Sequence, residues 1–168
     1  MEILLIEDDE AVREFISEVL LGAGYFVSVA GNGKDGLDEI KRDPDIAMVI
    51  TDIVMPEKEG IETIIEIKQS WPQIKIIAIS GGGRICAEDY LHIASELGAD
   101  VTLKKPFTRT ELLGAVADMA RRKNPDVKIP VIGDYPDVFV WDRADMPSSG
   151  FLSNKYKWNQ HNENDVRR

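Results

Sequence analysis

Short apolar runs alternate with amphipathic stretches along the first 123 residues of the chain. The apolar runs cover residues 3–6, 25–30, 46–51, 74–80 and 101–104. Within most of them, Ile, Val and Leu occupy successive positions rather than alternate ones. Because strands that are buried on both faces carry this continuous pattern, the runs predict five strands of a parallel sheet covered by helices.

The stretches between the runs carry apolar residues at the spacing of one helix face. They predict helices that include residues 12–20, 37–40, 61–68, 91–97 and 112–119. Gly22 and Gly98 follow the first and the fourth of these helices, where glycine commonly ends a helix. Thr108 and Glu111 have the spacing of a capping box at the start of the fifth.

This alternation of strands and helices predicts the architecture. A strand that leads into a helix and then into a parallel strand forms a right-handed crossover. Five such units give an α/β fold, a doubly wound five-stranded parallel sheet with helices on both faces, which ends near Lys123. Ligands of such sheets bind at the carboxyl ends of the strands, so the functional groups are expected at that edge.

Polar residues follow four of the five predicted strands. They are Glu7, Asp8 and Asp9 after the first strand, Asp52 after the third, Ser80 at the end of the fourth and Lys105 after the fifth. Two like charges about 4 Å apart repel by about 4 kcal/mol at an effective dielectric constant near 20, so the acids would not gather without a cation. Lys105 or a hard metal ion such as Mg²⁺ would supply that charge. A hydroxyl and an ammonium group opposite the acids would hold a phosphoryl group, so the pattern predicts an aspartyl-phosphate site.

Each of these residues also has an ordinary structural interpretation. Asp9 is most simply the N-cap of the first helix, and Glu7 and Asp8 taken alone leave both interpretations open. Asp52 is harder to explain structurally, because an acid that ends an apolar strand needs a partner or a role. The order and spacing of the residues together favour a site.

The same residues carry a resemblance to a known family. The matching segments are Ile3-Leu4-Leu5-Ile6-Glu7-Asp8-Asp9-Glu10, Thr51-Asp52-Ile53-Val54-Met55-Pro56 with Gly60, Ile77-Ala78-Ile79-Ser80, Gly98-Ala99 and Lys105-Pro106-Phe107. In this order they closely resemble the receiver domain of bacterial two-component response regulators, with coverage from about residue 2 to residue 123. The resemblance implies the flavodoxin-like receiver fold and a response regulator of the single-domain type.

The resemblance also implies a role for each matching residue. Asp52 would be the nucleophile that accepts a phosphoryl group from a sensor histidine kinase or a histidine phosphotransfer protein. Glu7 and Asp8 would be the acidic pair at a Mg²⁺ ion, with Asp9 as the alternative ligand if the register is shifted by one. The backbone carbonyl of Val54 would be a further ligand of the ion.

Two more roles follow from the same resemblance. Ser80 stands where the family has the switch hydroxyl that moves to bond the phosphoryl oxygen. Lys105 matches the lysine that pairs with the phosphoaspartate, and its peptide bond to Pro106 is expected to be cis.

The chain departs from the family pattern in the region that switches. Receivers commonly carry Tyr or Phe three residues before the lysine, and Thr102 occupies that position here. The run Gly81-Gly82-Gly83 gives the loop after Ser80 unusual backbone freedom. We therefore expect a loop rearrangement, not the rotation of a ring, to carry the signal, and phosphorylation to change amide exchange over residues 81–90.

Composition narrows the set of partners. With 20 basic and 30 acidic residues, the net charge of −10 opposes a nucleic-acid backbone. No apolar run approaches the ~18 residues of a membrane span, and the chain does not start with a basic signal sequence. Cys86 is the single cysteine, so an internal disulfide is excluded. We expect a cytoplasmic protein that neither binds nucleic acid nor inserts into membranes.

The composition changes after Lys123. Residues 124–168 form an extension rich in Pro, Asn and aromatic residues, without the helices of a DNA-binding output domain. Val138-Phe139-Val140-Trp141 predicts a short strand. The extension is either loosely ordered or docked on the receiver or on a partner, and the sequence leaves both open.

The sequence thus predicts a phosphorylation-dependent signalling switch that acts through protein contacts with a downstream target. It does not decide whether the protein forms a homodimer. The protein would catalyse its own phosphoryl uptake and loss without being a conventional enzyme. One rival is a phosphohydrolase of the haloacid dehalogenase type, which would need a second acid at position 54, where the chain has Val. A nucleotide- or flavin-binding module would need a phosphate loop where this chain has acids. A pseudo-receiver that never takes phosphate is the third rival.

Overall fold

The structure is a computed structural model that describes residues 1–55, 60–81, 86–123 and 139–140 of the 168-residue chain. Its elements are β1 (Glu2–Ile6), α1 (Glu10–Gly22), β2 (Phe26–Ala30), α2 (Gly33–Arg42), β3 (Ile46–Asp52), α3 (Gly60–Ser70), β4 (Lys75–Ser80), α4 (Ala87–Glu96), β5 (Val101–Lys104), β6 (Phe107–Thr108), α5 (Arg109–Lys123) and β7 (Phe139–Val140). The five predicted strands and five predicted helices are all present, and each strand lies within one residue of its predicted bounds.

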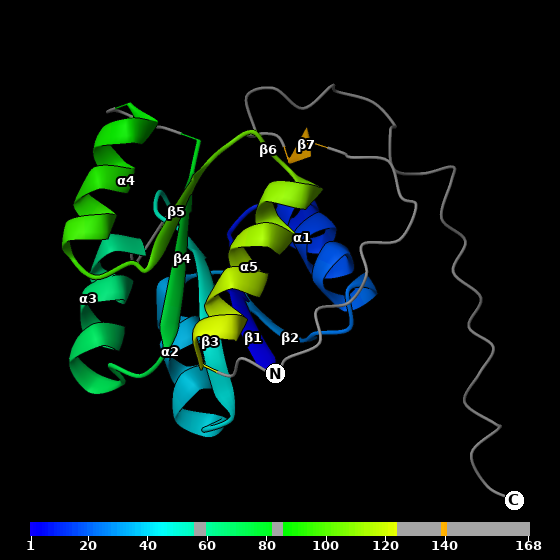
Figure 1. The fold of residues 1–168 in the computed structure, drawn as a ribbon. Helices are drawn as coiled ribbons and strands as arrows, with labels where there is room; N and C mark the ends of the chain where they lie inside the picture. The colour runs from blue at the N-terminus through cyan, green and yellow to red at the C-terminus, as the bar shows by residue number, and fades with distance from the viewer. Residues whose placement is uncertain (56–59, 82–85, 124–138, 141–168) are drawn as a thin grey trace, which may run out of the picture.

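The five main strands form one parallel sheet in the order β2-β1-β3-β4-β5. Because β1 lies between β2 and β3, the chain reverses its direction of winding there, which makes the sheet doubly wound. Helices cover both faces, with α1 and α5 on one side and α2, α3 and α4 on the other (Figure 1). The predicted fold class is therefore confirmed.

Two apolar layers hold the helices on the sheet. Ile3 and Leu5 of β1 pack with the buried faces of α1 and α5, whereas Leu4 and Ile6 pack with α2, α3 and α4. All four side chains are fully buried, so β1 contributes to both layers. The central strands carry a continuous apolar pattern because both of their faces are buried. The edge strands β2 and β5 are more exposed.

The helix ends follow the local signals of the sequence. Asp9 is the N-cap of α1, because its Oδ1 accepts hydrogen bonds from the amides of Ala11 (3.0 Å) and Val12 (3.2 Å). Thr108 and Glu111 form the predicted capping box: the amide of Thr108 donates to Glu111 Oε2 (2.7 Å), and the amide of Glu111 donates to Thr108 Oγ1 (3.1 Å). Gly98 ends the α4 segment with a φ of 111°, a conformation that favours glycine.

A second, two-stranded sheet joins distant parts of the chain. β6 pairs antiparallel with β7, with Phe107 opposite Val140 and Thr108 opposite Phe139. β7 lies within the short strand that the sequence predicts, whose flanking positions 138 and 141 fall outside the described residues. The proposed boundary at residue 123 and the character of the extension stay predictions. No helix in the described ranges is long and apolar enough to cross a bilayer.

An ion-pair network fastens the amino-terminal edge of the sheet, opposite the predicted site. The carboxylate of Asp100 accepts hydrogen bonds from Lys68 Nζ (2.9 Å), Lys75 Nζ (3.0 Å) and the amide of Ile76 (3.0 Å). Burial alone would raise the pKa of Asp100, but these three hydrogen bonds outweigh it and hold the pKa below its ordinary value of 3.8. The network ties the end of α3 to the starts of β4 and β5.

We predict that Asp100→Asn lowers the free energy of unfolding by about 1 kcal/mol at pH 7, a small value because the network is partly solvated. A carboxylate whose pKa is lower in the folded state contributes stability at pH values above its unfolded pKa. This contribution is lost as the pH falls through the folded-state pKa. The difference from wild type should therefore shrink below pH 3.8 in urea unfolding experiments. A difference that stays constant down to pH 3 would contradict this assignment.

Candidate functional site

Three acidic side chains meet at the carboxyl edge of the sheet. Glu7 directly follows β1, Asp8 comes next, and Asp52 is the last residue of β3. One carboxylate oxygen from each residue lies within 4.8 Å of the others. Glu7 and Asp52 are buried, and Asp8 is half-buried. Because the neighbouring strands β1 and β3 both end here, the switch point of the sheet brings these acids together.

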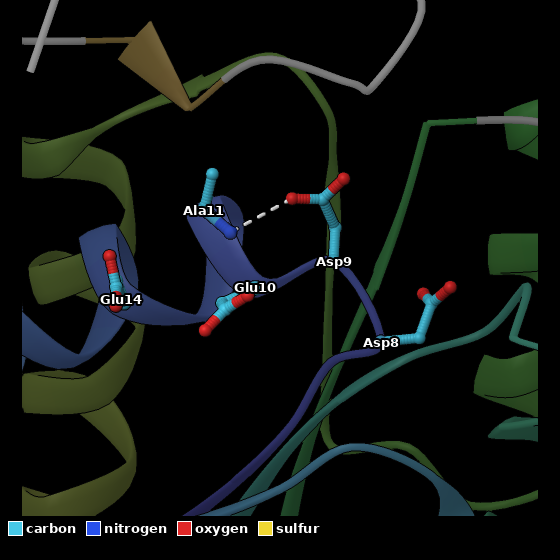
Figure 2. Close-up of a pocket in the computed structure, with 5 residues that line it drawn as sticks. All are labelled: Asp8, Asp9, Glu10, Ala11 and Glu14. Carbon is cyan, nitrogen blue, oxygen red and sulfur yellow. Dashed lines mark hydrogen bonds between the residues drawn. The ribbon is translucent and has the colours of Figure 1, made fainter.

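Asp9 lies next to this cluster but does not belong to it. Its carboxylate caps α1, as described above, and points toward the first helical turn (Figure 2). Among the residues that the structure describes, the acids that converge are therefore Glu7, Asp8 and Asp52, the three that the resemblance implies.

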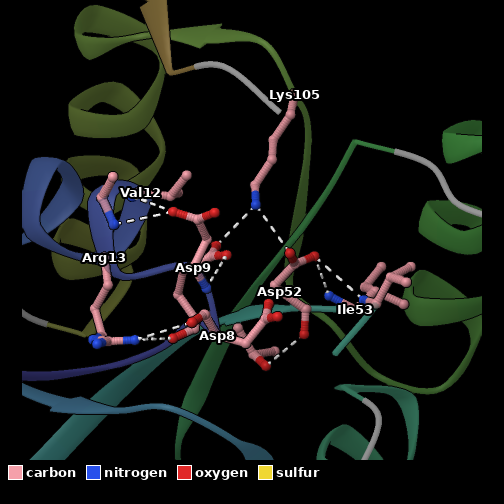
Figure 3. A network of polar contacts seen from close by, with 11 residues as sticks. Asp8, Asp9, Val12, Arg13, Asp52, Ile53 and Lys105 are labelled. Atoms are coloured by element: carbon pink, nitrogen blue, oxygen red, sulfur yellow. Dashed lines mark hydrogen bonds and ion pairs between the residues drawn. The ribbon is translucent and has the colours of Figure 1, made fainter. Parts of the chain in front are cut away.

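Lys105 places its ammonium group between two of these acids. Its Nζ lies 2.8 Å from Glu7 Oε2 and 2.9 Å from Asp52 Oδ2, and Lys105 and Asp52 point toward one another in Figure 3. The Lys105 amide donates to the carbonyl oxygen of Ser80 (2.8 Å), which ties the turn after β5 to the end of β4. The Lys105–Pro106 peptide bond is cis, as predicted.

Backbone amides hold the second oxygen of Asp52. Oδ1 accepts hydrogen bonds from the amides of Ile53 (2.6 Å) and Val54 (3.3 Å). Gly60, the first residue of α3, donates its amide to the carbonyl of Ile53 (3.0 Å). A Cβ atom at position 60 would lie 2.1 Å from the carbonyl oxygen of Asp52, so only glycine allows α3 to begin this close to Asp52. The sequence showed Gly60 as part of a motif and did not reveal this packing reason.

The charges of the cluster are not balanced. With every group ionised, three carboxylates and one ammonium group would leave a formal net charge of −2 in a mostly buried space. Burial first, and then the nearby charges of Asp52 and Asp8, raise the pKa of Glu7 to about 7 against the opposing effect of Lys105. Burial also raises the pKa of Asp52. Burial alone would lower the pKa of Lys105, but Asp52 and Glu7 reverse this and raise it.

This donor set fits a hard divalent cation. All three side chains offer oxygen ligands, and burial first, then the neighbouring carboxylates, makes the ionised form of Glu7 unfavourable without further positive charge. Mg²⁺ favours sites of few carboxylates that leave room for water and phosphate oxygens. Glu7, Asp8 and Asp52 are the residues that would hold it, and the carbonyl of Val54 stays a predicted further ligand.

Arg13 is a residue whose contribution the sequence did not reveal. Its Nη1 donates to the carbonyl oxygens of Glu7 (2.7 Å) and Asp8 (3.4 Å), so the guanidinium group of α1 holds the backbone that carries both acids (Figure 3). In the sequence, Arg13 is simply a basic residue five positions after Asp8. A basic residue five positions after an acid gives no sign that it bonds backbone carbonyls.

Ser80, which belongs to the predicted switch, lies on the same edge, whereas Thr102 lies two residues further back in the sheet. Ser80 is fully buried at the end of β4, opposite Lys104 in the sheet register. Thr102 is half-buried on β5 and lies opposite Ala78. Gly81 is half-buried, whereas Gly82 and Gly83 belong to residues 82–85, which lie outside the described part of the chain. The expected loop rearrangement therefore stays a prediction.

An open acidic hollow adjoins the cluster. Its lining consists of Asp8, Asp9, Glu10, Ala11 and Glu14 at the start of α1 (Figure 2). Four of these five residues are acidic, so the hollow repels the phosphate groups of a nucleotide. This charge weighs against the nucleotide- or flavin-binding alternative.

The fold and the site together define a class of protein: a doubly wound α/β protein with a buried Asp–Lys pair and a cation-type acidic cluster at its switch point. Residues 3–117 match the family model of the response regulator receiver domain. The chain belongs to this family. Receiver domains are signalling domains of two-component systems, they bind Mg²⁺ at an acidic cluster, and they are generally not enzymes.

Curated relatives are response regulators. The chain is 32% identical over 127 residues to the response regulator MprA of Mycobacterium leprae, an alignment that covers 75% of this chain and 54% of that protein. It is 33% identical over 123 residues to the transcriptional regulatory protein CpxR of Escherichia coli, which covers 73% of this chain and 50% of CpxR. The chain thus spans about half the length of these curated relatives.

Solved structures agree with this assignment. A response regulator receiver domain protein from Clostridium thermocellum superimposes with a TM-score of 0.68 and 30% identity, covering 75% of this chain and 98% of that one. The beryllofluoride-activated NtrC4 receiver domain dimer gives a TM-score of 0.65 at 26% identity, covering 72% and 97%. The recognition of a receiver from its motifs is confirmed.

The raised pKa of Glu7 predicts a pH-dependent stability without divalent cations. A carboxyl group whose pKa is higher in the folded protein contributes stability at pH values below its unfolded pKa of 4.5. This contribution to the free energy of unfolding is lost as the pH rises toward about 7, the folded-state pKa. Glu7→Gln should therefore be more stable than wild type at pH 8 by roughly 1–3 kcal/mol. Its free energy of unfolding should also depend less on pH between 4.5 and about 7. Urea unfolding in EDTA across pH 5–8 measures it, and a steeper slope in the variant would overturn the charge assignment.

The contacts of Arg13 predict a role in placing the acids. Arg13→Gln should weaken Mg²⁺ binding roughly tenfold, because charged hydrogen bonds to the backbone of Glu7 and Asp8 are lost. Isothermal titration with Mg²⁺ measures the change. Arg42→Gln is the matched control, because Arg42 pairs with Glu39 on the exposed surface of α2. Equal effects of the two substitutions would show that only net charge matters.

Proposed function

We propose that this protein is a phosphorylation-dependent switch of a two-component phosphorelay, in which Asp52 accepts a phosphoryl group from a phosphohistidine. The donor would be a sensor histidine kinase or a histidine phosphotransfer protein. The observation that carries the proposal is the placement of Asp52: it ends β3 between Lys105 and the acids Glu7 and Asp8. This arrangement supports the proposal, because the proposed acceptor, the ammonium group and the acids that would hold a cation lie together.

The proposed reaction is an in-line displacement at phosphorus. One carboxylate oxygen of Asp52 forms the new O–P bond while the N–P bond of the phosphohistidine breaks, and the electron pair leaves with the imidazole nitrogen. The amides of Ile53 and Val54 hold the carboxylate of Asp52 in one orientation. The activation free energy therefore does not include the entropy cost of fixing a mobile side chain.

Charge neutralisation supports the same step. Lys105 already touches the nucleophile, so its ammonium group would pair with an oxygen of the transferred phosphoryl group. A Mg²⁺ ion bound by Glu7, Asp8 and Asp52 would neutralise charge on the phosphoryl oxygens. The chain would thereby catalyse its own phosphoryl uptake and loss, which is not the activity of a conventional enzyme.

The switch would act through the neighbouring strand. The product adds about two negative charges and three acceptor oxygens at position 52. Ser80 ends β4, and its carbonyl already accepts from the amide of Lys105, so a shift of either residue reaches the other. We propose that Ser80 moves to bond the phosphoryl group and that the loop after it changes the surface offered to a partner.

Position 54 argues against the phosphohydrolase alternative. A haloacid dehalogenase would need an acid there, and Val54 offers a partly exposed apolar side chain. A pseudo-receiver is less favoured as well, because Glu7, Asp8, Asp52 and Lys105 are all in place.

The proposed partners are proteins. The net charge of −10 disfavours a nucleic-acid backbone as the partner of these residues. We propose that this chain acts through contacts with a downstream protein in the cytoplasm, and a homodimer is compatible with this function.

Intact mass after incubation with acetyl phosphate and Mg²⁺ tests the proposal. Wild type should gain one phosphoryl group, and Asp52→Asn should gain none, because its amide is not a nucleophile. Asp8→Asn should slow uptake at least tenfold by weakening the cation site. Asp9→Asn is the matched control: Asn caps a helix as well as Asp does, so uptake should match wild type.

Two results would contradict the proposal. Phosphoryl uptake by Asp52→Asn would place the acceptor elsewhere in the chain. Loss of uptake in Asp9→Asn together with normal uptake in Asp8→Asn would show that the alternative register of the metal ligands is the correct one.

A further inference from the structure

The strand β2 forms one edge of the main sheet, and its outer side carries exposed apolar residues. Within the described ranges, β2 pairs with β1 alone. Phe26 is 68% exposed and Val29 is 52% exposed. Soluble proteins commonly protect an edge strand with charged residues, proline or a covering segment, because its free backbone groups can pair with another strand. The strand itself has neither a charged residue nor a proline.

The backbone of β2 shows which residues are available for such pairing. The Phe26 amide (3.3 Å) and the Ala30 carbonyl (3.1 Å) make hydrogen bonds with the residues that directly precede and follow β1. Both residues therefore face β1. Because the backbone groups of successive residues in a strand point in alternating directions, those of Val27 and Val29 point away from β1.

The sequence of β2 is complementary to itself when two copies run antiparallel. A two-fold axis at Ser28 places Val27 opposite Val29 of a second copy, and these two residues can then exchange both of their backbone hydrogen bonds. The same axis places the exposed ring of Phe26 opposite Ala30 of the second copy, whose small side chain leaves room for the ring.

Ser28 has a hydroxyl group that this pairing would satisfy. Its Oγ is buried and has no hydrogen-bond partner among the residues that the structure describes. In the symmetric pair the two Ser28 residues are direct neighbours, and the Cβ atoms of such neighbours lie about 4.5–5.5 Å apart. A rotation about χ1 then lets one hydroxyl donate to the other, since each can both donate and accept.

Charge indicates which occupant suits the edge. Residues 19–33, which include all of β2, contain no charged residue, although 30% of the chain is charged. Two copies of a chain with a net charge of −10 repel each other at long range, and an uncharged edge lets them approach with less repulsion. A partner that is recognised through its charge, basic or acidic, would find no ion on β2 to pair with.

We propose that the outer edge of β2 is a self-association surface, on which a second copy of this chain pairs its own β2 in antiparallel register about Ser28. Backbone hydrogen bonds and the burial of Phe26 and Val29 stabilise the dimer. Two strands of this length bury less than about 1,200 Å², the range of weak and transient complexes. The surface uses no residue of the acidic site, so the inference goes beyond the proposed function and does not depend on it.

Sedimentation equilibrium of the full-length protein in EDTA tests the association. The average mass should rise toward twice that of one chain between roughly 10 µM and 1 mM, where weak complexes form. Val29→Glu should weaken the association at least about tenfold, because it places like charges across the two-fold axis. Ile93→Glu is the matched control: Ile93 is an exposed apolar residue of α4, so the same change of charge there should leave the association like that of wild type.

Two further measurements separate the interface from an effect on folding. Position 29 of one copy lies diagonally across from position 29 of the other, within reach of long side chains. An equimolar mixture of Val29→Glu and Val29→Lys should therefore associate more strongly than either variant alone. In wild type, the amides of Val27 and Val29 should exchange several-fold more slowly at high concentration, whereas the Phe26 amide, already bonded to Met1, should not change.

The contrary results are distinct. The mass of a single chain at every concentration would overturn the proposal, and so would equal weakening by Val29→Glu and Ile93→Glu, which would place the contact elsewhere. Growth beyond two copies would contradict the closed two-fold pairing. None of these results would bear on phosphoryl uptake at Asp52, which the acetyl phosphate experiment decides separately.

Discussion

The site depends on the shared ammonium group of Lys105. Glu7 and Asp52 end neighbouring strands and are both buried, so their carboxylates would repel each other strongly without a positive charge between them. Lys105 supplies that charge to both, and its amide is bonded to the end of β4. One residue therefore joins the ends of β1, β3 and β4. With every group ionised, one ammonium group against three carboxylates leaves the cluster short of positive charge, a setting that suits a divalent cation.

The fold was predictable because its signals are local. Continuous apolar runs marked the buried strands, helical spacing marked the helices, and Asp9 and the Thr108–Glu111 pair marked helix starts. The first residues of β2 and β4 differ by one from the prediction, since Tyr25 and Ile74 are buried without belonging to the strands. Burial shapes the apolar pattern, whereas a strand also requires backbone pairing, which the pattern does not report.

The sequence predicted which residues gather at the candidate site, but it did not predict the contacts that hold them in place. The alternation of elements implied that Glu7, Asp8 and Asp52 would share the carboxyl edge of the sheet. The strand order, which places β1 beside β3 and brings the three acids together, came only with the structure. The backbone contacts of Arg13 and the close approach of Gly60 depend on side-chain and main-chain geometry that no spacing encodes. The pairing of β7 with β6 joins residues more than 30 positions apart, and only its strand propensity was visible in the sequence.

The most direct test of the central claim is the chemical identity of the modified residue. Borohydride reduces an acyl phosphate of aspartate to homoserine, so peptide mapping after acetyl phosphate treatment and reduction locates the phosphorylated carboxylate. We expect homoserine at position 52, formed with Mg²⁺ and not in EDTA. Homoserine at another position, or equal conversion in EDTA, would contradict the account that a cation-dependent acidic site makes Asp52 the phosphoryl acceptor.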